Sequence, residues 1–469
     1  MSSAHSQPEP VNEYERTPVP DNALLGLKSF VGQYAGEHVA GTELMIGSLF
    51  VAAGVGAVDI LLGLLVGNIL AVLSWTFFTA PIATRCRLTL YYQLEKICGR
   101  KLVILYNIAN GTMFCFLAGA MITVSSTALG AWFQLPMPGL TDYYPNNLGW
   151  IICVLAMGAL FSLVAAYGYE FLAHFANIAA PWMIMVFIAF GLIGLHELNI
   201  QSFSDFWPVA KSVIWKGGNP LPGQVKFTFW HVTFFAWFCN MAWHIGMADL
   251  SVLRYAKKPW YALGSAAGMY IGHGMAWLSA SILYALQLHE NPANTDVLPG
   301  VLAARACGVT GLICVIVAGW TTANPTLYRA GLAFQAIIPN ASRFRVTLMI
   351  GAASTLTALF PAVMMKLLDF VALYGMILMP MGAVIFVDFW ILPKLNMRPF
   401  YAEKQGISFY WAAGFAWFIT LAACTCLVKF SGVQIFFVSL PGWFIAASLY
   451  IIFSKISQHT NAPELEKLP

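Results

Sequence analysis

The pattern of hydrophobic positions divides the chain into long apolar runs that are separated by shorter polar connections. Each run has about the 20 residues that a helix needs to cross a bilayer. We therefore predict an all-α integral membrane fold with twelve transmembrane helices. The predicted spans are residues 38–57, 59–82, 102–133, 148–167, 171–195, 228–247, 260–286, 306–336, 344–361, 367–391, 409–429 and 434–453.

Composition agrees with the pattern. Hydrophobic residues make up 59% of the 469 positions and charged residues only 9%, whereas a soluble chain carries about 25% charged residues. The net charge of +4 does not indicate a nucleic-acid partner, because the basic residues lie in short connections between spans. The nine cysteines form no C-x-x-C pair and are interpreted as small apolar residues.

The basic residues also predict an orientation. They gather in the connections after spans two, six, eight and ten, whereas the loops 134–147 and 287–299 contain no Lys or Arg. The longer loop 196–227 holds three lysines, but long loops count less in this rule. We therefore predict a multi-pass protein of the cytoplasmic membrane with both termini in the cytoplasm.

Two of the spans carry polar residues at membrane depth. The first contains Glu43 among small residues, and the sixth contains Asn240 and His244, about 200 residues later. Spans three and eight repeat this offset. Interrupted helices at matching positions of two halves indicate an inverted-repeat transporter, which binds substrate and ion at the breaks. The alternative is that small residues are common in membrane helices and the match is accidental.

The stretch AGWTTANPTLYRAGLAFQ, residues 318–335, interrupts the apolar pattern most strongly. Ala318, Thr321 and Thr322 share one face of a helix, and Pro325 leaves the Thr321 carbonyl without its helical partner. Hydroxyls and spare carbonyls at this depth are hard oxygen ligands that suit a small alkali cation. The alternative is a pair of hydroxyls that bond back to their own helix at a proline kink.

Four fragments carry a family resemblance. The run GWTTANPTLYRAGLAF, residues 319–334, resembles the eighth helix of the nucleobase–cation symporter family 1, which includes cytosine permease. PMGAVIFVDFW (380–390), LLVGNILA (64–71) and ADLSVLRYAKKP (248–259) are similar to that family's tenth helix, second helix and loop after helix six. The resemblance implies a LeuT-type fold, in which five helices are followed by an inverted copy and two more helices.

The chain is divided accordingly into six parts. They are a disordered cytoplasmic tail at 1–27, a first five-helix repeat at 28–195, an extracellular connection at 196–227, a second, inverted repeat at 228–391, helices eleven and twelve at 392–453, and a cytoplasmic tail at 454–469.

The resemblance also implies a cation site and a substrate class. The family takes up purines, pyrimidines and related rings, often with Na⁺. Its cation is held by helix-one carbonyls, one helix-eight carbonyl and two hydroxyls spaced i, i+3 and i+4. In this chain the helix-eight pattern falls on Ala318, Thr321 and Thr322, and the helix-one carbonyls fall near Glu37 and Ala40.

The substrate site implied by the family is a sandwich of a flat ring between aromatic side chains of helices three and six. Phe116 stands where the family has a helix-three tryptophan, and Asn324 matches a polar position of helix eight. Trp243 is as well explained by packing or lipid contact as by stacking. The expected substrate-binding residues are Gly41, Thr42, Glu43, Phe116, Asn240, Trp243, His244 and Asn324.

Glu43 departs from the family, which seldom places a carboxylate in helix one. An ionisable side chain inside a span costs at least about 2.5–3.5 kcal/mol, which makes it a functional hypothesis. Glu43 could accept ring N–H groups, pair with a cationic substrate or carry the coupling proton. The alternative is a neutral glutamate that is bonded to Thr42, His38 or His244 and only supports the break.

The function predicted from the sequence is import of a nucleobase-like ring by Na⁺ symport, with a small molecule and the bilayer as partners and no cofactor. One alternative is a H⁺-coupled transporter of an organic cation with Glu43 as counter-ion, and another is a transporter-like receptor. No enzyme motif occurs in the sequence. His38, His231 and His273 are interpreted as structural, and Asp249 and Arg254 as an inner-gate or loop pair.

Overall fold

The computed structural model describes residues 14, 16–138, 142–167, 169–238, 244–338, 341–362 and 367–460. Within these ranges all regular secondary structure is helical, apart from two isolated β-bridges. Eight helical segments of the described residues are long and apolar enough to cross a membrane. The other four predicted spans, numbers one, six, seven and nine, correspond to shorter or interrupted helices.

The first span is broken in the middle. Helix α1 (Leu27–His38) ends at the break, and α2 (Thr42–Ala52) begins after Gly41. The helix therefore starts eleven residues earlier than the predicted span 38–57. The reason is that α1 has the sequence LKSFVGQYAGEH, whose polar residues hide a helix from an apolar-run criterion.

The sixth and seventh spans are also irregular. Helix α10 (Phe229–Phe238) ends before residues 239–243, which lie outside the described residues, and the chain then turns before α11 (Leu250–Leu253). The seventh span begins as the 3-10 helix η4 (Pro259–Gly264), includes the π-helix η5 (Ala267–Gly274) and continues as α12 (Met275–Glu290). Of the polar positions, Glu43 thus lies in the first turn of α2, directly after the break of span one, and His244 lies in a turn of span six, whereas Asn240 lies outside the described residues.

The remaining elements run in chain order as follows. They are η1 (Asp21–Ala23), α3 (Ala57–Ser74), η2 (Trp75–Thr79), α4 (Ala80–Cys86), α5 (Leu90–Cys98), α6 (Arg100–Trp132), α7 (Leu148–Tyr167), α8 (Tyr169–Glu197), α9 (Phe203–Val209), η3 (Ala210–Ile214), α13 (Pro299–Ile337), α14 (Arg343–Ala358), α16 (Leu367–Phe386), η6 (Val387–Ile391), η7 (Pro393–Leu395), α17 (Tyr401–Gln405), α18 (Trp411–Phe430), η8 (Ile435–Phe437) and α19 (Ser439–Thr460).

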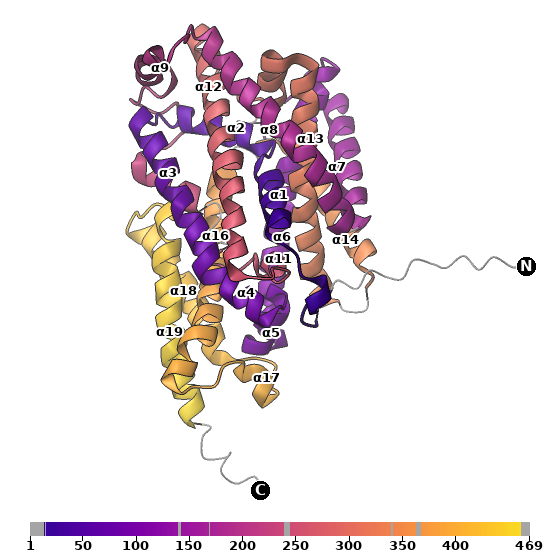
Figure 1. Cartoon of the computed structure of the whole chain (residues 1–469), viewed down its shortest axis with the longest axis vertical. Coiled ribbons are helices and arrows are strands. Elements are labelled where there is room, and N and C mark those ends of the chain that lie inside the picture. The colour runs from indigo at the N-terminus through magenta and orange to yellow at the C-terminus, as the bar shows by residue number, and fades with distance from the viewer. Residues whose placement is uncertain are drawn as a thin grey trace, which may run out of the picture.

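Helices α6 and α13 pack along each other through the middle of the bundle, whereas α18 and α19 stand at one edge (Figure 1). Small residues allow this central contact. A Cβ on Gly319 would collide with the hydroxyl of Ser125, so glycine lets α13 approach α6 closely. Near its start α13 is kinked at Gly308, which has a positive φ of 55°, a conformation that glycine adopts without strain.

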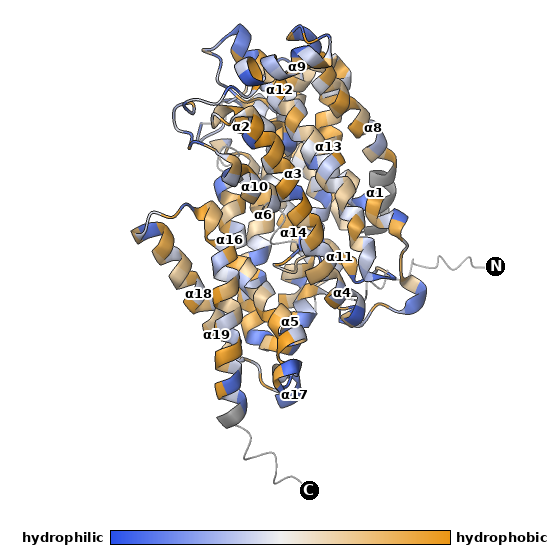
Figure 2. Ribbon diagram, turned by 60° about the vertical axis from the view of Figure 1, so that its left-hand side comes forward, coloured by the Kyte–Doolittle hydropathy of each residue, from blue (hydrophilic) through white to orange (hydrophobic). Residues whose placement is uncertain are grey.

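The two ends of the bundle differ. Helix α9 lies at one end, and α5 and α17 lie at the other, which we call the α5 end (Figure 1). Hydrophilic residues gather in the connections at both ends, whereas hydrophobic residues dominate the helices between them (Figure 2). The α5 end carries the basic connections, and there Lys96 and Glu403 form an ion pair of 2.9 Å.

Part of the segment predicted as an N-terminal tail has a described position. Residues 1–13 and 15 lie outside the described residues. From residue 16 onward the segment contacts the α5 end, where Asp21 pairs with Arg87 at 2.6 Å. The N–H of Leu25 donates to the carbonyl of Tyr255 at 2.7 Å. The segment thereby joins the connection after α4 to the connection after α11.

Candidate functional site

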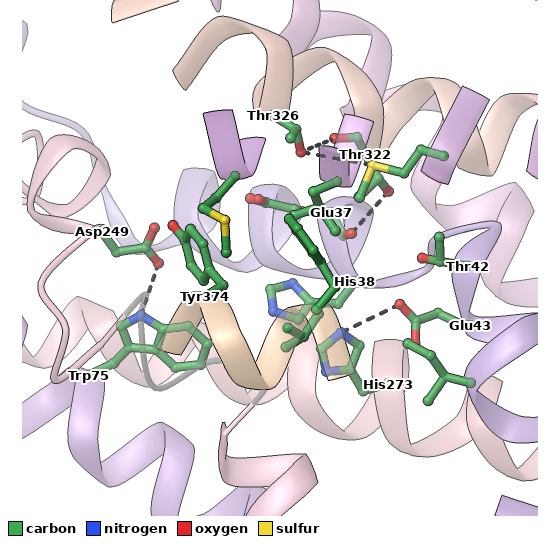
Figure 3. A pocket seen from close by; sticks show the side chains of 16 residues that line it. Glu37, His38, Thr42, Glu43, Trp75, Asp249, His273, Thr322, Thr326 and Tyr374 are labelled. Carbon is green, nitrogen blue, oxygen red and sulfur yellow. Dashed lines mark hydrogen bonds and ion pairs between the residues drawn. The ribbon is translucent and has the colours of Figure 1, made fainter. Parts of the chain in front are cut away.

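A cavity lies beside the break between α1 and α2 (Figure 3). Its lining combines apolar, polarisable side chains from α2, α6, α16 and η2 with polar side chains from α1, α2, η5, α13 and the segment before α11. The apolar lining includes Ile46, Trp75, Met113, Leu117, Met121, Phe370, Val371 and Tyr374. The polar lining consists of Glu37, His38, Thr42, Glu43, Asp249, His273, Thr322 and Thr326.

Oxygen atoms of α1 and α13 meet at the edge of this cavity. The hydroxyl of Thr322 lies 3.1 Å from the carbonyl oxygen of Glu37 and 3.0 Å from that of Ala318. The hydroxyl of Thr321 lies 3.1 Å from the same Ala318 carbonyl. Glu37 is in the last turn of α1, where carbonyls lack helical partners. The structure thus brings together Glu37, Ala318, Thr321 and Thr322, which we call the oxygen cluster.

The remaining residue of the predicted cation site is Ala40, which lies within the break. Its carbonyl accepts the N–H of Glu43 at 3.1 Å. The neighbouring Gly41 contacts the scaffold closely: a Cβ there would lie 3.0 Å from Val124 and 3.2 Å from the carbonyl of Val315. Gly41 therefore lets the break pack against α6 and α13 and does not line the cavity.

A buried ionic network lies beside the cavity. Arg329 of α13 forms an ion pair with Glu37, and it lies 3.3 Å from Asp249. Asp249 also accepts hydrogen bonds of 2.9 Å each from the hydroxyl of Tyr34 and the indole of Trp75. We call Glu37, Asp249 and Arg329 the gate network. It joins α1, α13 and the segment that precedes α11.

The structure pairs Asp249 with a residue other than the expected Arg254. Asp249 pairs with Arg329, whereas Arg254 donates to the carbonyls of Tyr14 (2.7 Å) and Ser251 (3.0 Å). Arg329 was visible in the sequence as an arginine inside an apolar span. Such a residue is a functional hypothesis by default, and that signal could have identified it.

Glu43 lines the cavity, and its partners come from the seventh span. The indole N–H of Trp277 donates to Oε2 of Glu43, and Nε2 of His273 lies 3.6 Å from Oε1. The His273 ring stacks on Trp277 with centroids 4.5 Å apart and an interplanar angle of 12°. The centroid of the His38 ring lies 4.4 Å from that of His273, at an interplanar angle of 51°. Two histidines interpreted as structural therefore line the cavity beside Glu43.

The structure places the other expected substrate residues as follows. Thr42 lines the cavity, but Phe116 packs against Phe370 at 5.2 Å and leaves the lining position to its neighbour Leu117. His244 is fully buried, and its ring packs against Trp75 at 5.1 Å.

Asn324 faces α7, where its amide group lies 2.9 Å from the carbonyl oxygen of Phe161. It is not among the residues that line the cavity. Asn240 and Trp243 lie outside the described residues.

No family model and no curated protein matches the chain. Solved structures do. Mhp1, a nucleobase-cation-symport-1 family transporter, in a closed conformation with bromovinylhydantoin bound, is similar with a TM-score of 0.70 and 14% identity over 95% of this chain and 96% of that chain. The inward-facing conformation of Mhp1 is similar with a TM-score of 0.70 and 12% identity over 96% and 92%.

The substrate-bound outward-open state of a Na⁺-coupled sialic acid symporter is also similar, with a TM-score of 0.67 and 12% identity over 95% of this chain and 92% of that chain. These similarities cover nearly the whole length of each protein. The chain therefore has the LeuT-type transporter fold that its sequence resemblance to the nucleobase–cation symporter family 1 implied.

Proposed function

We propose that the protein is a secondary active transporter that imports a purine- or pyrimidine-type ring compound together with Na⁺ by alternating access. The observation that carries the proposal is the oxygen cluster. It joins the end of α1 to the middle of α13, and two of its residues, Glu37 and Thr322, also line the cavity. A Na⁺ held there would fasten the two helices and add positive charge beside the substrate.

The lining of the cavity supports a flat substrate without negative charge. Trp75, Phe370 and Tyr374 offer aromatic surfaces, and Met113 and Met121 offer polarisable thioethers. Such side chains bind flat rings well. The described lining contains three carboxylates and no lysine or arginine, which disfavours an anionic ligand. The carboxylate and imidazole edges can pair with the N–H and C=O groups of a nucleobase.

The gate network supports the direction of transport. Arg329 follows the lining residues Thr322 and Thr326 along α13, and we propose that the network gates the cavity on the side of the α5 end, which the basic connections predict to be cytoplasmic. An inward-opening step would have to separate Glu37 and Asp249 from Arg329. In our proposal spans one, two, six and seven rock against the other helices and thereby break these ion pairs.

Thermal stabilisation of the purified protein tests this function. A ligand that binds only the folded state raises the free energy of unfolding, by about 2.7 kcal/mol at a hundred times its Kd. We expect stabilisation by a neutral nucleobase that grows with Na⁺. Replacing both hydroxyls, Thr321→Ala with Thr322→Ala, is expected to abolish the Na⁺ effect and to leave the protein folded.

Thr420→Ala is the matched control, because this buried hydroxyl bonds back to the Ala416 carbonyl of its own helix, α18. Na⁺ dependence that persists in the double variant would contradict the cation assignment.

A second candidate function is transport of an organic cation with Glu43 as its counter-ion. The position of the Glu43 carboxylate in the cavity lining favours it. The two functions separate in the same assay. Stabilisation by amines alone, insensitive to Na⁺ but sensitive to pH, would support the second candidate and contradict the first.

A further inference from the structure

We propose that Asn110 is a positioning residue of the gate, because it connects the lining of the cavity to the turn of α13 that carries Arg329; this inference rests on the proposed transport function. Three hydrogen bonds make the connection. The hydroxyl of Tyr374 donates to Oδ1 of Asn110 at 3.1 Å, and Nδ2 of Asn110 donates to the hydroxyl of Tyr91 at 3.1 Å. The hydroxyl of Tyr91 donates in turn to the carbonyl of Arg329 at 3.2 Å. We call these three hydrogen bonds the polar chain.

The polar chain starts at the cavity. Tyr374 of α16 is one of the lining residues, and it is labelled in Figure 3. Its ring also packs against the ring of Phe114, with centroids 5.8 Å apart. Phe114 lies one turn after Asn110 on α6, so both residues are on the same face of that helix. Tyr374 is therefore held at two places on α6, and a ring compound that packs against it would contact the first member of the chain.

Asn110 suits its position because an amide side chain both accepts and donates hydrogen bonds. Each tyrosine hydroxyl has one hydrogen to donate. Oδ1 of Asn110 accepts the hydrogen of Tyr374, and Nδ2 donates to Tyr91, which leaves the hydrogen of Tyr91 for the carbonyl of Arg329. The amide is fully buried, so an apolar replacement would leave both tyrosine hydroxyls without this partner.

The last bond of the chain supports α13 at a weak point. Pro325 lies inside the helix one turn before Arg329. Because proline has no N–H, it cannot bond to the carbonyl of Thr321, four residues earlier. The hydrogen bond from Tyr91 holds the following turn from outside the helix. It thereby fixes the backbone from which the guanidinium of Arg329 reaches its two carboxylate partners.

The polar chain also lies on the part of the bundle that stays still in our proposal. Helices α6, α13 and α16 are spans three, eight and ten, which do not rock. The carboxylates of the gate network belong to span one and to the segment that follows span six, which do. We therefore infer that the chain keeps Arg329 in place while Glu37 and Asp249 leave it and return.

Thiol labelling tests the proposal in the full-length protein. Thr326 lines the cavity, so Thr326→Cys reports access to it when the nine native cysteines are replaced. The reagent is impermeant and is added to membrane vesicles on the α5 side. Asn110→Leu removes two bonds of the polar chain and so weakens the hold on Arg329. At about threefold for each side-chain hydrogen bond within a membrane protein, labelling should become about tenfold faster.

Asn107→Leu is the matched control. Asn107 is a buried asparagine three residues earlier on α6, and its Oδ1 has no hydrogen-bond partner among the described residues. It does not belong to the polar chain. We expect this variant to label at the rate of its parent.

A double-variant cycle separates positioning from a general loosening of the bundle, and it does not depend on the folding of Asn110→Leu. Tyr374→Phe removes one bond of the chain and Tyr91→Phe removes two, so labelling should become about threefold and about tenfold faster. If both act through the chain, adding Tyr374→Phe to Tyr91→Phe should have no further effect, because the chain is already interrupted. Independent losses of packing would multiply instead.

The proposal is overturned if Asn110→Leu labels at the parental rate, if Asn107→Leu labels as fast as Asn110→Leu, or if the two tyrosine effects multiply. Arg329→Met is the reference. Fast labelling of that variant together with parental labelling of Asn110→Leu overturns the polar chain and leaves the gate assignment intact. The assay contains neither Na⁺ nor a ring compound, so a failure of the proposed transport function would appear in the thermal assay and not in this one.

Discussion

Replacing Arg329 with methionine removes the only cation of the gate network and keeps a side chain of similar length. Arg329 is 5% exposed and Asp249 is 1% exposed. Without the guanidinium, Glu37 and Asp249 lose their shared partner. Removing one partner of a buried ion pair costs about 3–5 kcal/mol. We expect this cost to destabilise the conformation that contains these ion pairs, which in our proposal is closed at the α5 end.

The same energetic cost determines how the ratio of closed to open molecules changes. Since about 1.4 kcal/mol is a factor of ten, a loss of about 3–5 kcal/mol changes the ratio of closed to open molecules by more than about a hundredfold. A form that is open at the α5 end and populated at about 1% would become the majority. Arg329→Met should therefore open the cavity toward the side that is predicted to be cytoplasmic.

Thiol labelling measures this opening. Thr326 lines the cavity one helical turn before Arg329, so Thr326→Cys reports access in a background in which the nine native cysteines are replaced. With an impermeant reagent on the α5 side, Arg329→Met should label about a hundredfold faster than its parent.

Arg305→Met is the control, because Arg305 forms a partly exposed pair with Glu197, and such pairs contribute only about 0–1 kcal/mol. Asp249→Asn keeps the pair of Arg329 with Glu37 and should give a smaller increase. A folded Arg329→Met protein that labels at the parental rate would refute the gate assignment.

Two further predictions concern packing and pH. A Cβ on Gly272 would overlap His38, so Gly272→Ala should lower the thermal stability by about 1–3 kcal/mol, whereas Gly26→Ala, with no atom near its added methyl, should not. Hydrogen bonds from the hydroxyl and N–H of Ser202 hold the pKa of Asp205 below its ordinary value. The protection factors of the α9 amides, which correct for the intrinsic exchange rate, should therefore stay constant above about pH 4 and decrease as pH falls through that lowered pKa.

The spans and the breaks could be predicted because they depend on local patterns. Apolar runs gave the long helices, and polar residues within runs marked the interruptions in spans one and six. The α13 residues of the oxygen cluster, Ala318, Thr321 and Thr322, followed from their spacing on one helical face, whereas Glu37 followed from the family resemblance. The first half of the broken span escaped prediction because α1 is polar enough to resemble a connection.

Contacts between distant helices could not be predicted in this way. The partners of Glu43 lie about 230 residues away, and nothing in the local pattern states how η5 and α12 are rotated relative to α2. The same limit applies to α6. One position along a helix changes the direction of a side chain by about 100°, which is why Leu117 lines the cavity while Phe116 packs against Phe370.

Glu37 links the two parts of the site through one residue. Its carbonyl belongs to the oxygen cluster, and its carboxylate belongs to the gate network. In the proposed transporter, Na⁺ at the carbonyl would fix the end of α1 and so hold the carboxylate against Arg329. Na⁺ should therefore slow the labelling of Thr326→Cys from the α5 side.

Glu37→Gln separates the two roles, because it keeps the carbonyl and removes the charge. We expect this variant to retain stabilisation by Na⁺, measured by thermal unfolding, since its oxygen cluster is intact. Its labelling at Thr326→Cys should be fast and nearly independent of Na⁺, because the cation no longer acts on an ion pair. If Na⁺ still slows labelling of this variant as much as it slows the parent, the cation closes the gate by a route other than the Glu37 carboxylate.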